Sequence, residues 1–270
     1  MEVFCPNLEG INTSNTYMTT FSNKTIKPDI TYYNSSPSVE KADIESAELM
    51  IEAKFNDEDD PFKVVPTPKG FMRDSDRARH TLGQVASYAT AHLAAQFRTH
   101  TFSILLFRET ARLMRWDRAG VIVTERIPLD NPALKQFFWR FNNSDATGRG
   151  YDSTVTPFQL TRKLTKKFLF DELKFVDDPG ELKIKDIKFF KVLLPREFKS
   201  FVVGKPTYLG LSSLASRATR TFKAWCLTTN RPVFLKDTWR ILSPSLRPEH
   251  EIYKKLADAK VQHNRYCARL

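Results

Sequence analysis

The stretch from Asp76 to about Arg98 carries the clearest helical pattern in the sequence. Apolar residues recur there at the spacing of three or four that lines one face of an α-helix: Leu82, Val85, Ala89, Leu93 and Phe97. Short apolar or β-branched segments lie on both sides of it: 47–55 (AELMIEAKF), 102–107 (FSILLF), 111–116 (ARLMRW) and 121–124 (VIVT). A single long helix among short strands is typical of a mixed α/β domain.

Turn residues divide the rest of the chain. Asp117 and Gly120 occupy the first and fourth turn positions between two strand-like segments, which predicts a β-hairpin, and Pro132 begins a short helix with an aromatic face. We expect a polar N-terminal segment at 1–26, with loops at 11–25, and a mixed α/β domain at 27–155. A linker region at 156–182 then leads into a strand-rich region at 183–270.

The charge of the chain is unevenly distributed. Of 270 residues with a net charge of +11, the first 60 hold 4 Lys and 12 Asp or Glu, a net charge of −8, so residues 61–270 carry +19. A basic surface of this size can meet nucleic acid, nucleotide phosphates or acidic partners.

The cysteines, the apolar runs and the first residues of the chain indicate where the protein is expected to reside. Three cysteines lie far apart, no apolar run approaches the length of about 20 residues that spans a bilayer, and the first ten residues lack the layout of a secretory signal. We therefore expect an intracellular protein, cytoplasmic or nuclear, without a membrane partner.

Three acidic and basic residues in the first part form a pattern with a chemical meaning. Asp29 follows Pro28, and 23 positions later Glu52 and Lys54 stand two residues apart on a strand, hence on the same strand face. Two carboxylates can share a divalent metal ion, and a lysine beside them can position the attacking water or the scissile phosphate.

This layout resembles that of restriction-endonuclease-like proteins, the PD-(D/E)xK group. In the long helix, Gln84 and Tyr88 are four residues apart and resemble the Gln-x-x-x-Tyr element of the RecB-like branch of that group. The resemblance implies a metal-dependent nuclease-like site at Asp29, Glu52, Lys54, Gln84 and Tyr88. The alternative is that Glu52 and Lys54 form an exposed strand pair while Tyr88 packs in the core, and the acidic character of residues 1–60 does not favour DNA.

The last part of the chain suggests a different chemistry. Two strands at 219–229 and 232–237 are followed by a helix that begins near Pro248, with Lys236 near the end of the second strand. A kinase amino-terminal lobe needs such a lysine to reach the ATP phosphates and a helix glutamate to hold it. Glu249 is the favoured partner because Ile252, Tyr253 and Leu256 follow it at helical spacing, and Glu251 is the alternative.

Longer blocks extend this likeness over most of the chain. The segments RLMRWDRAGVIVTERIP, FFWRFNNSDATGRGYDSTV and RATRTFKAWCLTTNRPVFLKDTWR resemble, in this order, the fungal-type protein kinase family, from about Lys27 to Val261. The resemblance implies a partial protein-kinase-like N-lobe of antiparallel strands and one helix at 183–270, with ATP and Mg²⁺ as ligands. Lys236, Glu249 and Arg217 are the ATP-binding residues that it implies.

Two departures from the family limit this interpretation. No glycine lies between Leu211 and Thr229, where a Gly-containing turn usually approaches the phosphates. A catalytic lobe also cannot fit into the 14 residues after Leu256, so we expect a truncated kinase that is inactive by itself, unless the sequence continues beyond Leu270. An incomplete lobe exposes apolar surface, which predicts a protein partner that covers it. The runner-up is a nucleic-acid-binding or nuclease-like protein in which the kinase remnant is an interaction module.

Overall fold

The chain folds into two compact units in the computed structural model. The structure describes residues 4–20, 24–35, 42–67, 70–161, 164, 188–195, 198–210, 213–239, 243, 245, 247 and 249–259. Unit 1 comprises residues 1–152 with 213–215, and unit 2 comprises 153–212 with 216–270. Both combine strands with few helices, so the chain is a mixed α/β protein with several sheets, as expected. Among the described residues, no helix is long and apolar enough to cross a membrane.

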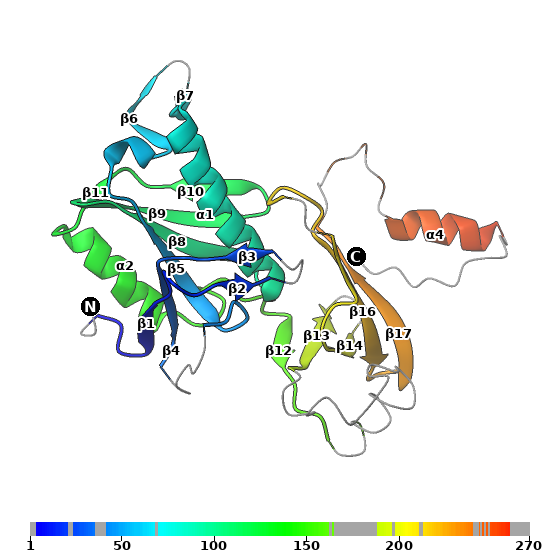
Figure 1. The fold of residues 1–270 in the computed structure, drawn as a ribbon. Coiled ribbons are helices and arrows are strands. Elements are labelled where there is room, and N and C mark those ends of the chain that lie inside the picture. The colour runs from blue at the N-terminus through cyan, green and yellow to red at the C-terminus, as the bar shows by residue number, and fades with distance from the viewer. Residues whose placement is uncertain are drawn as a thin grey trace. The chain divides into compact units, whose positions relative to one another are not determined.

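Unit 1 is built around one seven-stranded sheet (Figure 1). Its elements are β1 (Leu8–Asn12), β2 (Met18–Thr19), β3 (Thr25–Ile26), β4 (Ile30–Asn34), β5 (Ala47–Ala53), the short 3-10 helix η1 (Asp57–Asp59), β6 (Phe62–Thr67), β7 (Gly70–Met72), α1 (Asp76–Ala95), β8 (His100–Leu106), β9 (Thr110–Asp117), β10 (Gly120–Val123), β11 (Ile127–Pro128) and α2 (Pro132–Asn143). The sheet order is β1-β4-β5-β8-β9-β10, and β11 also pairs with β9. Strands β2 and β3, and β6 and β7, form two separate hairpins.

The direction of the central strands determines where the site can lie. β4 and β5 are antiparallel, with Ile30 opposite Ile51, whereas β5 and β8 are parallel, with Glu52 opposite Leu105. Parallel neighbours need a crossover connection, and α1 lies in the segment that joins them. The carboxyl ends of β5 and β8 and the start of β4 therefore share one edge of the sheet.

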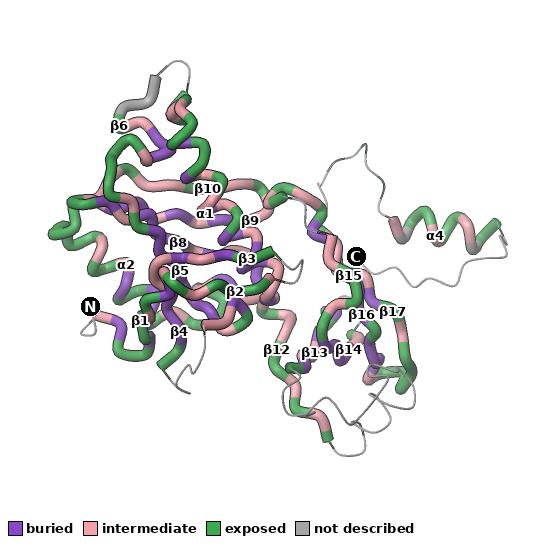
Figure 2. The backbone as a smooth tube through the Cα atoms, in the orientation of Figure 1, coloured by how far each residue is buried: buried purple, intermediate pink, exposed green. Residues whose placement is uncertain are grey.

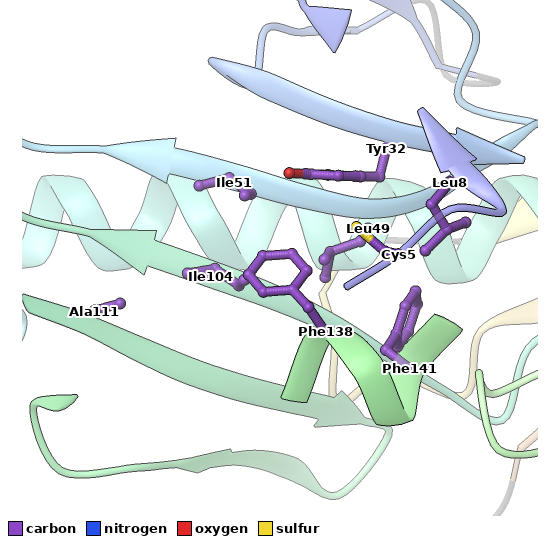
Figure 3. Close-up of a cluster of buried hydrophobic side chains, with 9 residues drawn as sticks. All are labelled: Cys5, Leu8, Tyr32, Leu49, Ile51, Ile104, Ala111, Phe138 and Phe141. Atoms are coloured by element: carbon purple, nitrogen blue, oxygen red, sulfur yellow. The ribbon is translucent and has the colours of Figure 1, made fainter. Parts of the chain in front are cut away.

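The two helices pack on opposite faces of this sheet because the side chains of β5 alternate between the faces. Leu49 and Ile51 join a buried cluster with Phe138 and Phe141 of α2 (Figure 3). The intervening Met50 packs with side chains of α1 in a second cluster. Strands β5 and β8 are consequently largely buried (Figure 2), and β5 ends at Ala53, before the last two residues of the apolar segment 47–55.

Local sequence signals account for the helix boundaries. The side chain of Ser75 accepts a hydrogen bond from the Ala78 N–H at the start of α1, and Asn131 caps α2 in the same way just before Pro132. The expected hairpin is present as β9 and β10, where the Asp117 side chain accepts from the N–H groups of Ala119 and Gly120.

The N-terminal segment differs from the expectation of loops. β1 pairs with β4 along five residues, and the β2–β3 hairpin contributes Met18 and Ile26 to the buried cluster under α1. Only Leu8 of β1 is buried, so this edge strand carries too little apolar patterning to be recognised. His92 of α1 is also buried, and its two ring nitrogens contact the Ala47 carbonyl and the Thr101 hydroxyl.

Unit 2 contains a six-stranded antiparallel sheet. Its elements are β12 (Val155–Pro157), β13 (Phe190–Leu194), β14 (Lys199–Val203), β15 (Tyr208–Gly210), β16 (Thr219–Cys226), β17 (Arg231–Asp237) and α4 (Glu249–Asp258). β17 pairs with residues 220–226 of β16, and β14 and β15 share the other edge of β16. Phe189, Val202 and Trp225 form its buried cluster.

The segment expected as a linker begins within this unit. β12 includes residues 156 and 157 and pairs with β13. Of the remainder of 156–182, residues 162–163 and 165–182 lie outside the described part of the chain, and so do residues 183–187 of the expected strand-rich region.

Candidate functional sites

The five residues of the nuclease-like pattern come from three separate segments of unit 1. Asp29 directly precedes β4, Glu52 lies in β5 with Lys54 just after its end, and Gln84 and Tyr88 lie one helical turn apart on α1. Because the carboxyl end of β5 and the start of β4 share one sheet edge, these segments meet there.

A continuous hydrogen-bond network joins four of these side chains. Lys54 Nζ donates to Glu52 Oε1 at 2.6 Å and to Gln84 Oε1 at 2.9 Å. The other end of the Gln84 amide donates from Nε2 to Tyr88 Oη at 2.7 Å, and Tyr88 Oη donates to Glu52 Oε2 at 3.1 Å. Both oxygens of Glu52 are thus held, one by the lysine and one by the tyrosine.

Asp29 joins the network through the main chain. Its Oδ2 accepts a hydrogen bond of 2.8 Å from the Ala53 N–H, the residue between the glutamate and the lysine. The carbonyl oxygen of Lys27 lies 2.9 Å from Tyr88 Oη, so the segment before β4 is tied to α1 as well. The role of this carbonyl was missed in the sequence, since a main-chain contact leaves no side-chain signal.

Glu52 and Lys54 differ in how far their side chains are buried. Glu52 is only 4% exposed, whereas 18% of the Lys54 side chain is accessible. Burial raises the pKa of Glu52 above its ordinary value, and the charge of Asp29 raises it further, while the bond from Lys54 opposes both effects. Burial and the nearby carboxylates likewise raise the pKa of Tyr88. The low exposure of Glu52 contradicts the interpretation of an exposed strand pair.

The donor set of this site is compatible with one mode of metal binding. In the described part of the chain, no group of three or more His, Cys, Asp or Glu side chains could enclose a metal ion. Mg²⁺ does not require such a cage, because it keeps several waters and is usually bound by one or two carboxylates together with substrate phosphates. Two carboxylates, those of Asp29 and Glu52, lie at this sheet edge.

The acidic run that follows Lys54 is matched by arginines. Asp57 and Asp60 pair with Arg126 at 3.0 and 2.8 Å, and Asp59 pairs with Arg77 at 2.8 Å. Over residues 1–152 the 18 Lys and Arg nearly balance the 20 Asp and Glu, a net charge of −2, which leaves +13 on residues 153–270. The acidic character of residues 1–60 is therefore offset by arginines from later segments of the same unit.

A second candidate site lies in unit 2, at β17 and α4. Lys236 Nζ lies 2.7 Å from both carboxylate oxygens of Glu249, and Tyr253 Oη donates to the same carboxylate at 3.0 Å. The bond from Lys236 is the main cause that lowers the pKa of Glu249. Glu251, the alternative partner, is exposed.

The glycine-poor segment before β16 is bonded to the end of β17. The Arg217 carbonyl oxygen accepts from the Trp239 N–H at 2.8 Å and from the Thr238 hydroxyl at 3.2 Å, while the Arg217 side chain is exposed. Ala218 adopts a φ of 42°, in the left-handed region that glycine adopts without steric cost. This backbone therefore makes a glycine-like turn without a glycine.

Comparison of the chain with known proteins does not add to the geometry of the two sites. No protein-family model, no curated protein and no solved structure matches the chain.

Proposed function

We propose that unit 1 hydrolyses phosphodiester bonds of nucleic acid with the help of a divalent metal ion, as restriction-endonuclease-like proteins do. The observation that carries this proposal is the network of Glu52, Lys54, Gln84 and Tyr88, with Asp29 bonded to the residue between the glutamate and the lysine. The five residues of the nuclease-like pattern come from three segments that are distant in the sequence, and they meet at one edge of the sheet.

The protein groups have distinct roles in this proposal. Asp29 and Glu52 would hold Mg²⁺, which supplies charge stabilisation for the phosphate and an activated water. Lys54 is accessible enough to contact a phosphate oxygen, and the Gln84 amide fixes its ammonium in place. Tyr88 acts through Glu52 as a positioning residue, because its hydroxyl orients the carboxylate.

A nicking assay on plasmid DNA and on circular single-stranded DNA, with Mg²⁺ or Mn²⁺, tests this function. We expect nicking by the purified full chain, its loss in Lys54→Ala and Glu52→Gln, and no change in Lys135→Ala, which removes a lysine of α2 outside the network. Absence of metal-dependent nicking, or nicking that Lys54→Ala leaves unchanged, would contradict the proposal.

A second candidate function belongs to unit 2, and we infer that it binds ATP as a kinase-like lobe does. The specific observation is the ion pair between Lys236 and Glu249, since kinases use such a lysine–glutamate pair to hold the α and β phosphates. Fungal-type protein kinases remain the proposed relatives of this unit.

Binding of a fluorescent ATP analogue in the presence of Mg²⁺ tests the second function. We expect saturable binding that Lys236→Met abolishes and Glu249→Gln weakens, with Lys223→Met on β16 as the matched control. Equal binding by the wild type and Lys236→Met would contradict it. Metal-dependent phosphate transfer that Lys236→Met abolishes would instead contradict the expectation of a kinase-inactive chain.

A further inference from the structure

Two exposed aromatic rings adjoin the candidate hydrolytic site of unit 1, and neither was identified in the sequence. Phe55 directly follows Lys54 and is 76% exposed, and Tyr17 precedes β2 and is 64% exposed. Exposed rings offer aromatic faces on which a ligand can stack, and these two lie beside a polar site.

Each ring is accompanied by a basic side chain. The guanidinium carbon of Arg108 lies 5.4 Å from the centre of the Phe55 ring, and Lys27 Nζ lies 5.2 Å from the centre of the Tyr17 ring. The Arg108 side chain is itself exposed, so both its charge and the Phe55 ring are accessible to a ligand.

Each ring–cation pair is connected to the candidate site through the segments from which its residues come. Phe55 and Arg108 follow the carboxyl ends of the parallel strands β5 and β8, which lie at the same sheet edge. Lys27 stands two residues before Asp29, and its carbonyl oxygen contacts Tyr88 of the network. One member of each pair, Phe55 or Lys27, thus comes from a segment that supplies a carboxylate.

We propose that the substrate of this site is single-stranded nucleic acid, whose unpaired bases stack on Phe55 and Tyr17 while Arg108 and Lys27 contact the flanking phosphates. An aromatic ring beside a basic group is the combination that binds single strands, because every unpaired base offers a face for stacking. The bases of a duplex are stacked on one another and cannot reach these rings. This inference rests on the proposed hydrolytic function only for the position of the scissile phosphate.

Binding without metal separates the inference from hydrolysis. Fluorescence anisotropy of labelled oligothymidine and oligouridine is measured with the full chain in EDTA, against a duplex of the same length. We expect tighter binding of a single strand than of the duplex, and the two homopolymers distinguish DNA from RNA. Phe55→Ala and Tyr17→Ala should each weaken single-strand binding roughly tenfold, the size of one lost stacking contact.

Matched variants control for charge and folding. Trp139→Ala removes a ring of α2 that is 57% exposed and should leave binding unchanged, while Phe55→Trp keeps a ring and should retain it. The basic unit 2 adds electrostatic binding that weakens steeply as salt is raised. The ratio of the single-strand affinities of wild type and Phe55→Ala should persist, because stacking does not depend on the charge of unit 2. Circular dichroism of each variant checks that it is folded.

The outcomes distinguish the two proposals. Equal affinity for single strand and duplex, or Phe55→Ala and Tyr17→Ala that bind as wild type does, overturns the inference even if Lys54-dependent nicking is present. Single-strand binding that depends on the rings, in the absence of any nicking, supports the inference and overturns only the proposal of hydrolysis.

Discussion

Removal of the Tyr88 hydroxyl is the sharpest test of how the unit 1 site is held together. The substitution Tyr88→Phe keeps the buried ring but takes the donor away from Glu52 Oε2 and from the Lys27 carbonyl oxygen. Gln84 is only half-buried, so water can replace the acceptor that it loses. The main cost therefore falls on the buried carboxylate.

The size of this cost follows from the charge of the acceptor. A hydrogen bond to a charged group contributes about 1.5–3 kcal/mol, so Tyr88→Phe should lower the free energy of unfolding of unit 1 by about that amount where Glu52 is ionised. The tyrosine bond lowers the pKa of Glu52, which burial has already raised above 4.5. Its removal raises the folded-state pKa of Glu52 further.

The sign of the pH dependence can be worked out from this shift. A carboxyl group whose pKa is higher in the folded than in the unfolded state binds more protons when folded, so stability falls as pH rises between the two pKa values. In Tyr88→Phe the two pKa values of Glu52, folded and unfolded, lie further apart than in wild type. The loss of free energy of unfolding relative to wild type should therefore be larger at about pH 8 than at about pH 4.

Hydrogen exchange followed by mass spectrometry measures the effect in unit 1 alone. The slowest amides of β5 and β8 should exchange roughly ten- to hundredfold faster in Tyr88→Phe at the higher pH, and the excess should shrink at the lower pH. Tyr33→Phe is the matched control, because that buried hydroxyl accepts from the Asp43 N–H and contacts no part of the Glu52 network. An equal deficit at both pH values would refute the reasoning.

Three further predictions concern other parts of the chain. Arg112→Ala leaves the fully buried Asp60 carboxylate with Arg126 as its counter-charge but removes the Arg112 hydrogen bonds to it, and should destabilise unit 1 by about 1.5–3 kcal/mol, measured by urea unfolding. Gly150→Ala should cost at least about 1–3 kcal/mol in the same assay, because φ is 101° and a Cβ would lie 2.0 Å from the His100 carbonyl oxygen. Glu249→Gln should speed hydrogen exchange of α4 near neutral pH by less than about tenfold, a surface ion pair being worth at most about 1 kcal/mol. The lowered pKa of this carboxyl means that wild type loses the same stabilisation as pH falls through that pKa.

The sequence was informative wherever one segment carried its own pattern. The apolar spacing predicted α1, and the two-residue period of an extended chain predicted that Glu52 and Lys54 lie on one side, with Lys54 just beyond the end of β5. The prediction that Gln84 and Tyr88 share a helix face needed only the helical period. None of these inferences depended on knowledge of the rest of the fold.

Contacts between distant segments were not accessible in the same way. β1 is a strand because it pairs with β4, and its own residues are mostly polar. His92 is buried because the Ala47 carbonyl and the Thr101 hydroxyl satisfy its ring, a condition set by two other strands. The exposed ring of Phe55 was overlooked because exposure, unlike periodicity, is a property of the folded surface.

Strand β5 carries two buried glutamates on the same face, and they are held in different ways. Glu48 accepts from the buried Arg98 at 2.9 Å and from Tyr151 and Asn34 at 2.8 Å each. Glu52 instead depends on a lysine that solvent reaches. The two ends of β5 therefore differ in access: the partner of Glu48 is closed to solvent, whereas the partner of Glu52 lies where an engineered substitution can meet solvent.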